Sequence, residues 1–160
     1  MATITKDTLG THKLPTTAPY GTASTLHYSL ATAANGSVVG GSSTAAVASG
    51  DVVRVGILPA GMRLNDSLTA VSIGWTATVT GKLGFAYVDG VDVAAVPQDD
   101  DYFNSSLALA TAGRYPANNV AVRPVVLPKD AYLIVTTGTA ANAKASQTDF
   151  LVSVTHVGVA

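Results

Sequence analysis

Apolar residues recur along this chain with the two-residue period of β-strands. Over residues 25–31, leucine and tyrosine alternate with histidine and serine, which makes one face of an extended segment apolar and the other polar. The same alternation returns near the C-terminus, over residues 149–158. Both segments therefore predict strands with one buried and one exposed face.

Runs of β-branched residues between turn signals predict further strands. The clearest run extends from Val52 to Leu58 and ends at Pro59-Ala60-Gly61, where proline fixes φ and glycine permits a positive φ. A similar strand–turn–strand pattern recurs over 126–133. Together these signals predict strands at 25–31, 51–58, 68–75, 76–80, 82–88, 120–127, 131–137 and 149–158.

One segment carries helix signals instead. Asp99-Asp100-Asp101 offers an N-cap and a favourable charge for a helix dipole, and Gly113 would end the helix. A short helix here is the minority alternative, because strand and turn residues dominate the rest of the chain.

Composition favours strands and one domain. The 160 residues are 48% hydrophobic and only 12% charged, and every acidic residue is an aspartate. Such a chain has no Glu and is poor in the Lys, Gln and Arg that also stabilise surface helices. We therefore predict an all-β fold, a mainly antiparallel β-sandwich over residues 25–160.

Residues 1–24 have no sustained period and predict an extended N-terminal arm. Pro15 and Pro19 hold the backbone near extended or polyproline geometry. A frayed terminus would have the same composition, so both interpretations stay open.

Charge and hydropathy exclude several partners. A net charge of −1 and a pI near 6.2 argue against nucleic acid, which proteins bind with strongly basic surfaces. No window approaches the roughly 20 continuous apolar residues that span a bilayer, so no membrane partner is expected. The N-terminal sequence has no secretory-signal pattern, and synthesis in the cytoplasm is expected.

The inventory of reactive side chains predicts no catalytic site, cofactor or metal. Cysteine is absent, and His12, His27 and His156 lie far apart in sequence. No Gly-x-Ser-x-Gly elbow is present. A hydrolase would need His27 or His156 hydrogen-bonded to an acid in a cleft.

Two binding alternatives stay open beside this prediction. Five aspartates between Asp89 and Asp101 are a source of oxygen ligands for calcium, although an exposed acidic loop explains them without metal. Four aromatic residues suggest a sugar-binding platform, although core packing is the simpler role for the tryptophan: Trp75, Tyr102, Phe103 and Tyr115.

Four segments, taken in their order along the chain, resemble capsid decoration (cement) proteins of tailed bacteriophages. They are the strand and corner Gly50–Leu64, the aromatic strand Leu83–Tyr87, the acidic Asp99–Phe103 and the closing strand Val152–Thr155. The resemblance covers roughly residues 50–157.

The resemblance implies a jelly-roll-like sandwich that binds the outside of a phage head shell. Such proteins act as dimers or trimers and stiffen the shell, so the expected partners are the major capsid protein and further copies of this chain, and the expected location is the virion surface. No catalytic residues come with it. A head-fibre or tail-associated receptor-binding domain is the alternative.

The arm is the segment we expect to contact the shell or a neighbouring copy. Proline limits its conformations before binding, which lowers the entropy cost of ordering it. The expected contact residues are Leu9, Leu14, Pro15, Pro19 and Tyr20.

Overall fold

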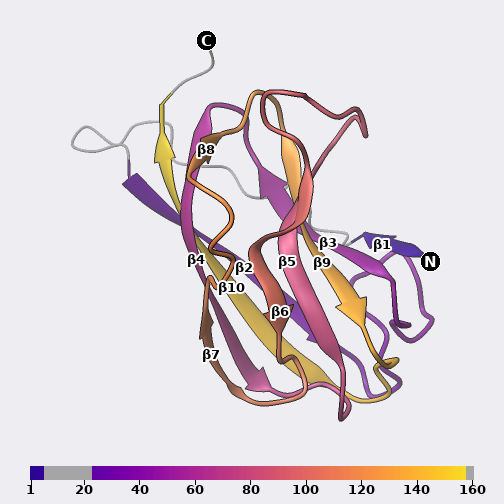
Figure 1. The fold of residues 1–160 in the computed structure, drawn as a ribbon. Coiled ribbons are helices and arrows are strands. Elements are labelled where there is room, and N and C mark those ends of the chain that lie inside the picture. The colour runs from indigo at the N-terminus through magenta and orange to yellow at the C-terminus, as the bar shows by residue number, and fades with distance from the viewer. Residues whose placement is uncertain (6–22, 158–160) are drawn as a thin grey trace.

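A computed structural model describes residues 1–5 and 23–157, which form ten strands in two sheets (Figure 1). The β9 sheet, named after its central strand, has the order β1 (Thr3–Thr5), β3 (Val52–Leu58), β9 (Ala131–Gly138), β5 (Thr80–Tyr87), β6 (Asp99–Leu107). The β10 sheet has the order β2 (Ala23–Thr32), β10 (Ser146–His156), β4 (Met62–Ile73), β7 (Gly113–Pro116), and β8 (Val125–Val126) also pairs with β4. These residues include no helix, and therefore none that could cross a membrane.

The strand pairing is that of a jelly roll. Early strands pair with late ones in antiparallel fashion, β2 with β10 and β3 with β9. The pairs β4–β7 and β5–β6 continue the series towards the middle of the chain. This is a long hairpin rolled into two facing sheets. The predicted all-β, jelly-roll-like sandwich is confirmed.

One apolar core fills the space between the sheets. In β10, buried and outward residues alternate along the strand, and Phe150 and Val152 are fully buried. Trp75 is 1% exposed, and its indole N–H donates to Thr148 Oγ1 at 3.1 Å, which satisfies its polar atom inside the core.

Most predicted strands are present, and the errors fall at turns. The predictions over 25–31, 51–58, 82–88, 131–137 and 149–158 correspond to β2, β3, β5, β9 and β10. The corner after β3 also forms as expected, with Gly61 at φ +75°.

Three other predictions were wrong in extent. Residues 68–75 and 76–80 do not form two strands, because β4 is one long strand from Met62 to Ile73. A turn follows it, with Thr78 at φ +71°. Of residues 120–127 only Val125–Val126 are in a strand.

The alternative helix after Asp99 is also wrong, since Asp99–Leu107 is strand β6. Tyr102 and Phe103 are both buried, and their rings pack edge to face with centroids 4.9 Å apart. Burial of these rings in the sandwich outweighs the local preference of aspartate for helix starts.

The first five residues belong to the body of the sandwich. Residues Thr3–Thr5 pair in parallel with Val52–Arg54 at the edge of the β9 sheet, and Ile4 is 1% exposed. On the other side of the expected arm, β2 begins at Ala23.

Candidate interaction surfaces

The expected contact residues cannot be placed on any surface. Leu9, Leu14, Pro15, Pro19 and Tyr20 all lie within residues 6–22, outside the described residues. The surfaces below are therefore built from other parts of the chain.

The first of these surfaces is an acidic bulge in β6. Leu83 pairs with Asn104 and Phe85 with Asp99, so the chain from Asp99 to Asn104 spans only two residues of its partner strand. The extra residues fold over β5 at Gly84, where a Cβ would lie 2.1 Å from the backbone oxygen of Asp99. Glycine is therefore required for the bulge to lie this close.

Two asparagines hold the outer edge of the bulge. The Nδ2 atom of Asn119 donates to the backbone oxygen of Asp101 at 2.9 Å and to its Oδ1 at 3.1 Å. The backbone N–H of Asn118 donates to the carbonyl of Phe103 at 2.9 Å. The edge of β6 is thus covered by a loop at these positions.

The five aspartates expected to lie together fall into separate groups. Asp89 pairs with Lys129 at 2.8 Å, and Asp92 Oδ1 accepts the backbone N–H of Gln98 at 2.7 Å. Only Asp99, Asp100 and Asp101 have carboxylate oxygens within 4.8 Å of one another. A calcium ion shared by all five side chains does not fit this arrangement.

One lysine neutralises part of the acidic bulge. Lys82 Nζ lies 3.4 Å from Asp100 and 3.7 Å from Asp101, and the charge of Asp100 raises the pKa of Lys82. Burial raises the pKa of Asp99, and the neighbouring carboxylates of Asp101 and Asp100 add to this effect. The bulge therefore already contains a cation at its outer carboxylates.

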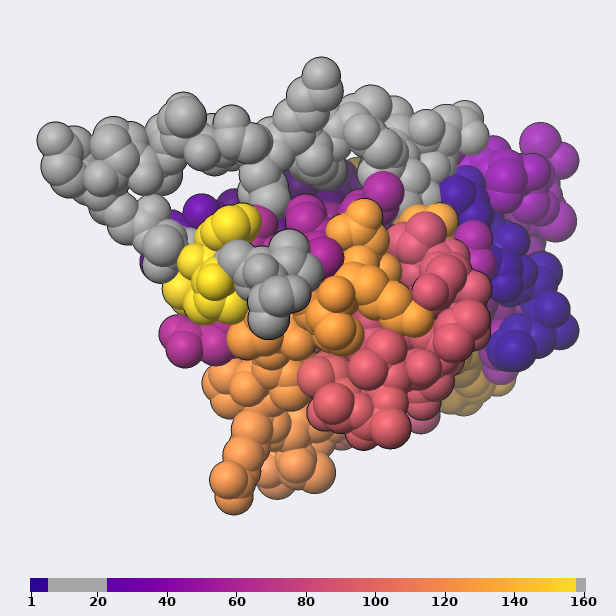
Figure 2. Space-filling model, turned by 90° about the horizontal axis from the view of Figure 1, so that it is seen from above, coloured from indigo at the N-terminus to yellow at the C-terminus, as the bar shows by residue number. Residues whose placement is uncertain are grey.

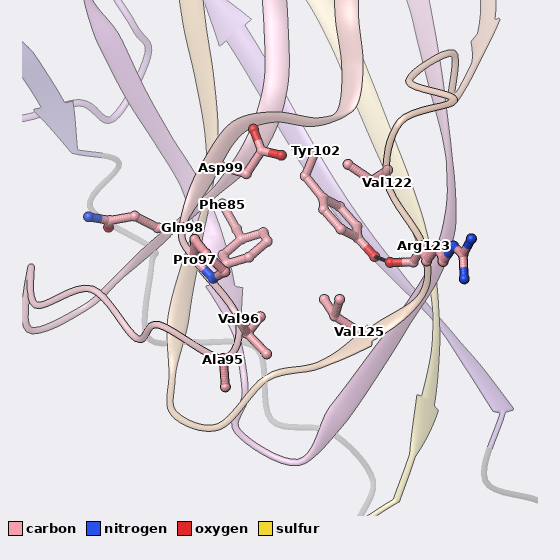
Figure 3. A pocket seen from close by; sticks show the side chains of 10 residues that line it. All are labelled: Phe85, Ala95, Val96, Pro97, Gln98, Asp99, Tyr102, Val122, Arg123 and Val125. Carbon is pink, nitrogen blue, oxygen red and sulfur yellow. Dashed lines mark hydrogen bonds between the residues drawn. The ribbon is translucent and has the colours of Figure 1, made fainter.

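The second surface is an apolar pocket of about 390 Å³ beside the bulge (Figure 3). It lies between the β5–β6 loop and the segment that precedes β8. The Tyr102 hydroxyl donates to the backbone oxygen of Arg123 at 2.8 Å and ties the two sides together. The lining residues are Phe85, Ala95, Val96, Pro97, Gln98, Asp99, Tyr102, Val122, Arg123 and Val125.

The two segments that border this pocket also carry exposed valines. Val91 is 62% exposed in the β5–β6 loop, and Val120 is 98% exposed in the segment after β7. Val88 and Val126 are exposed as well. Figure 2 shows the atoms of both segments side by side. An apolar pocket bordered by segments with exposed apolar side chains is typical of an association site.

Neither His27 nor His156, the two histidines in the described residues, forms the arrangement that a hydrolase would need. His27 Nε2 lies 3.2 Å from Asp149 Oδ1, but the His27 side chain is 61% exposed on the outward face of the β10 sheet. An open sheet face does not exclude water from a reacting group. His156 is exposed at the end of β10.

The four aromatic residues do not form a sugar-binding platform. Trp75, Tyr102 and Phe103 are buried in the core. Tyr115 is half-buried in β7, and its hydroxyl donates to the Thr111 carbonyl at 2.8 Å.

Sequence reasoning missed both the bulge and the pocket. The bulge depends on a register shift, and the pocket on two segments about 25 residues apart that meet only in the fold. Gly84 was the one available signal, because a glycine inside a strand often marks close backbone approach.

Comparison with known proteins identifies the fold. No family model and no curated protein matches this sequence. A chain from the capsid of Ralstonia phage GP4 superposes with a TM-score of 0.67 over 99% of both chains, at 13% identity. A chain from the cyanophage Pam1 capsid asymmetric unit gives 0.57 over 90% of this chain and 91% of that one, at 14% identity. The chain therefore shares its fold with chains found in phage capsids.

Proposed function

We propose that this chain is a virion structural protein that decorates and stabilises the outer face of a phage head shell. The observation that carries the proposal is the fold likeness to a phage capsid chain over 99% of both chains. The sequence resemblance to cement proteins favours decoration over building the shell itself.

The apolar end of the sandwich supports an assembly role. A pocket of about 390 Å³ lies there, and the two segments that border it carry exposed valines, so a free protein would gain by covering this surface. The low charge of the chain, 12% of residues, makes desolvation of such a contact less costly than that of a highly charged surface.

Residues 6–22 supply a second contact in this proposal, with Leu9, Leu14, Pro15, Pro19 and Tyr20 against the shell or a neighbouring copy. A few apolar side chains contribute only several kcal/mol at about 25 cal/mol per Å². Tight binding therefore needs several linked contacts, which a dimer or trimer provides.

The first test adds purified full-length protein to shells that lack it and measures co-sedimentation at limiting concentration. A triple variant, Leu9→Ser, Leu14→Ser and Tyr20→Ser, is expected to lower occupancy several-fold and to leave the unfolding transition unchanged. Its matched control changes three threonines of the same segment, Thr8→Ala, Thr16→Ala and Thr17→Ala.

Three results would contradict parts of this proposal. Equal occupancy of the triple variant and its control removes the role of residues 6–22. Failure of the unaltered protein to bind shells removes the decoration role. Assembly of closed shells by this chain alone would identify it as the shell-forming protein instead.

A further inference from the structure

Residues 2–5 lie in a groove that binds them as a strand. Strand β3 forms one wall, and Gly41 and Ser42 form the other. Thr5 is paired on the second wall, since its carbonyl accepts the Ser42 N–H at 2.7 Å and its N–H donates to Ser42 Oγ at 3.1 Å. We call this groove the β1 slot.

The slot encloses the side chain of Ile4 and provides a hydrogen-bond acceptor for the backbone N–H of Ala2. Ile4 is 1% exposed, and a Cβ on Gly41 would lie 3.2 Å from its Cγ2 atom, so glycine leaves just the room that isoleucine fills. The N–H of Ala2 donates to Asp51 Oδ1 at 2.7 Å, and Asp51 is itself buried. The slot therefore recognises an extended segment with isoleucine at the position of Ile4.

The jelly roll is complete without β1. The antiparallel strand pairs of the two sheets involve only β2 to β10, whereas β1 pairs in parallel with β3 alone. In Figure 2 the indigo atoms of residues 1–5 lie at one side of the molecule. The slot can thus exchange its occupant without any change in the order of the other strands.

The geometry points to a second copy of this chain as that occupant: we propose that, in the homo-oligomer, residues 2–5 of one copy fill the β1 slot of a neighbour. This inference rests on the proposed function only in needing neighbouring copies. The same contacts form in either case, so exchange has little enthalpic cost. Residues 6–22 connect β1 to β2 and reach up to about 60 Å when extended, enough to cross to an adjacent copy.

Local concentration decides between the two arrangements. A connection of this length holds β1 near its own slot at an effective concentration of about millimolar. Copies held side by side in an oligomer or on a shell present their slots at a comparable concentration.

Engineered cysteines test this exchange cleanly, because the chain has none of its own. Thr3 and Val52 are direct partners in the β1–β3 pair and both line the outer groove of the β9 sheet, so cysteines there are close enough for a disulfide. One full-length variant carries Thr3→Cys and a second carries Val52→Cys. They are refolded together, concentrated, bound to shells where shells are available, and oxidised.

The expected result is a disulfide between position 3 of one chain and position 52 of the other, which doubles the 16.1 kDa mass without reductant. Peptide mass spectrometry identifies the mixed link. Val52→Cys with Thr136→Cys in one chain is the positive control, because these residues pair between β3 and β9. Thr3→Cys with Thr136→Cys is the negative control, since Val52 lies between them.

Failure of the exchange is distinguishable from failure of the proposed function. If the mixed variants stay unlinked, free and on shells, while Thr3→Cys/Val52→Cys in a single chain links within that chain, each copy keeps its own β1 and the exchange is overturned. Absence of the link in both formats overturns the slot itself. Binding to shells is read separately by co-sedimentation and tests only the decoration role.

Discussion

The β2–β10 pair and the β5–β6 pair differ in the regularity of their strand pairing. In the first, residues Ala23–Thr32 pair with Ser146–Thr155 without any register shift. In the second, the pairing shifts twice within β5, and Asp99–Phe103 bulge over Gly84. The β2–β10 pair is regular along its whole length and covers the core. The β5–β6 pair instead carries the acidic bulge, the close contact at Gly84 and part of the pocket lining.

The difference shows which strands of this fold can change their outward side chains without disturbing the core. A regular ladder sends every second side chain into the core, so its sequence is constrained throughout. A bulge breaks that constraint and turns carboxylates and aromatic rings in directions that a regular strand does not allow. The experiments below separate the two regions, from the largest expected effect to the smallest.

Phe150→Ala is expected to destabilise the protein most, by about 3–5 kcal/mol, because it opens a cavity in the regular ladder. Phe150 is fully buried in β10. Its neighbour Leu151 faces outward and is half-buried, so Leu151→Ala, the matched control, should cost about 1 kcal/mol or less. Urea unfolding at fixed protein concentration measures both, and equal losses would show that the ladder does not alternate as described.

Gly84→Ala should cost about 1–3 kcal/mol by forcing the bulge away from β5. The added Cβ would meet backbone atoms of Asp99 and Asp100, which cannot rotate aside. Gly138→Ala is the control, because a Cβ there meets only the Thr80 hydroxyl, at 3.1 Å. The same unfolding measurement applies, and a loss no larger than that of Gly138→Ala would mean that the bulge does not lie on Gly84.

The same contrast explains how much of the fold was predictable. Alternation over 25–31 and 149–158 is a local signal, and it identified β2 and β10. Asp99–Leu107 has no alternation, and its three aspartates resemble a helix start more than a strand. Its strand conformation comes from long-range burial of Tyr102 and Phe103, which no local pattern contains.

The interaction surfaces were less predictable than the fold. The apolar residues that line the pocket were visible in the sequence, but the pocket itself forms only where the β5–β6 loop meets the segment before β8. Strand β1 escaped prediction for a similar reason. Three residues are too few to show a period, and their pairing with Val52–Arg54 is a contact across nearly fifty residues.

Asp99→Asn is expected to stabilise the protein at pH 7 by removing a charge from the bulge. Burial raises the pKa of Asp99 in the folded state, so the ionised carboxylate opposes folding. Below its ordinary pKa of 3.8, Asp99 is protonated in both states and the folded protein loses no stability to its charge. As the pH rises through the higher folded pKa, the carboxyl must ionise in the buried site and this stability is lost. Asparagine keeps an acceptor for the Asp101 N–H, which Asp99 Oδ1 accepts at 3.0 Å.

The measurement for Asp99→Asn is the difference in unfolding free energy from the unaltered protein, taken at pH 7 and at about pH 3. The gain should shrink at the lower pH. Asp66→Asn is the control, since Asp66 also accepts a backbone N–H, from Ser67, but lies outside the bulge. A variant that is destabilised at pH 7, or equally stabilised at both values, would contradict the charge argument.

Asp89→Asn should have the smallest effect and the opposite sign. The hydrogen bond from Lys129 lowers the pKa of Asp89, so its contribution to stability is present above pH 3.8 and is lost as the pH falls. The Asp89 side chain is 52% exposed, which limits its effect to a small fall in Tm at pH 7 that shrinks as the pH falls below 3.8. Because Lys129 Nζ also lies 4.6 Å from the centre of the Tyr87 ring, a cycle of Asp89→Asn, Lys129→Gln and the double variant isolates the ion pair. A coupling that persists in 1 M salt or at low pH would show that the contact is not electrostatic.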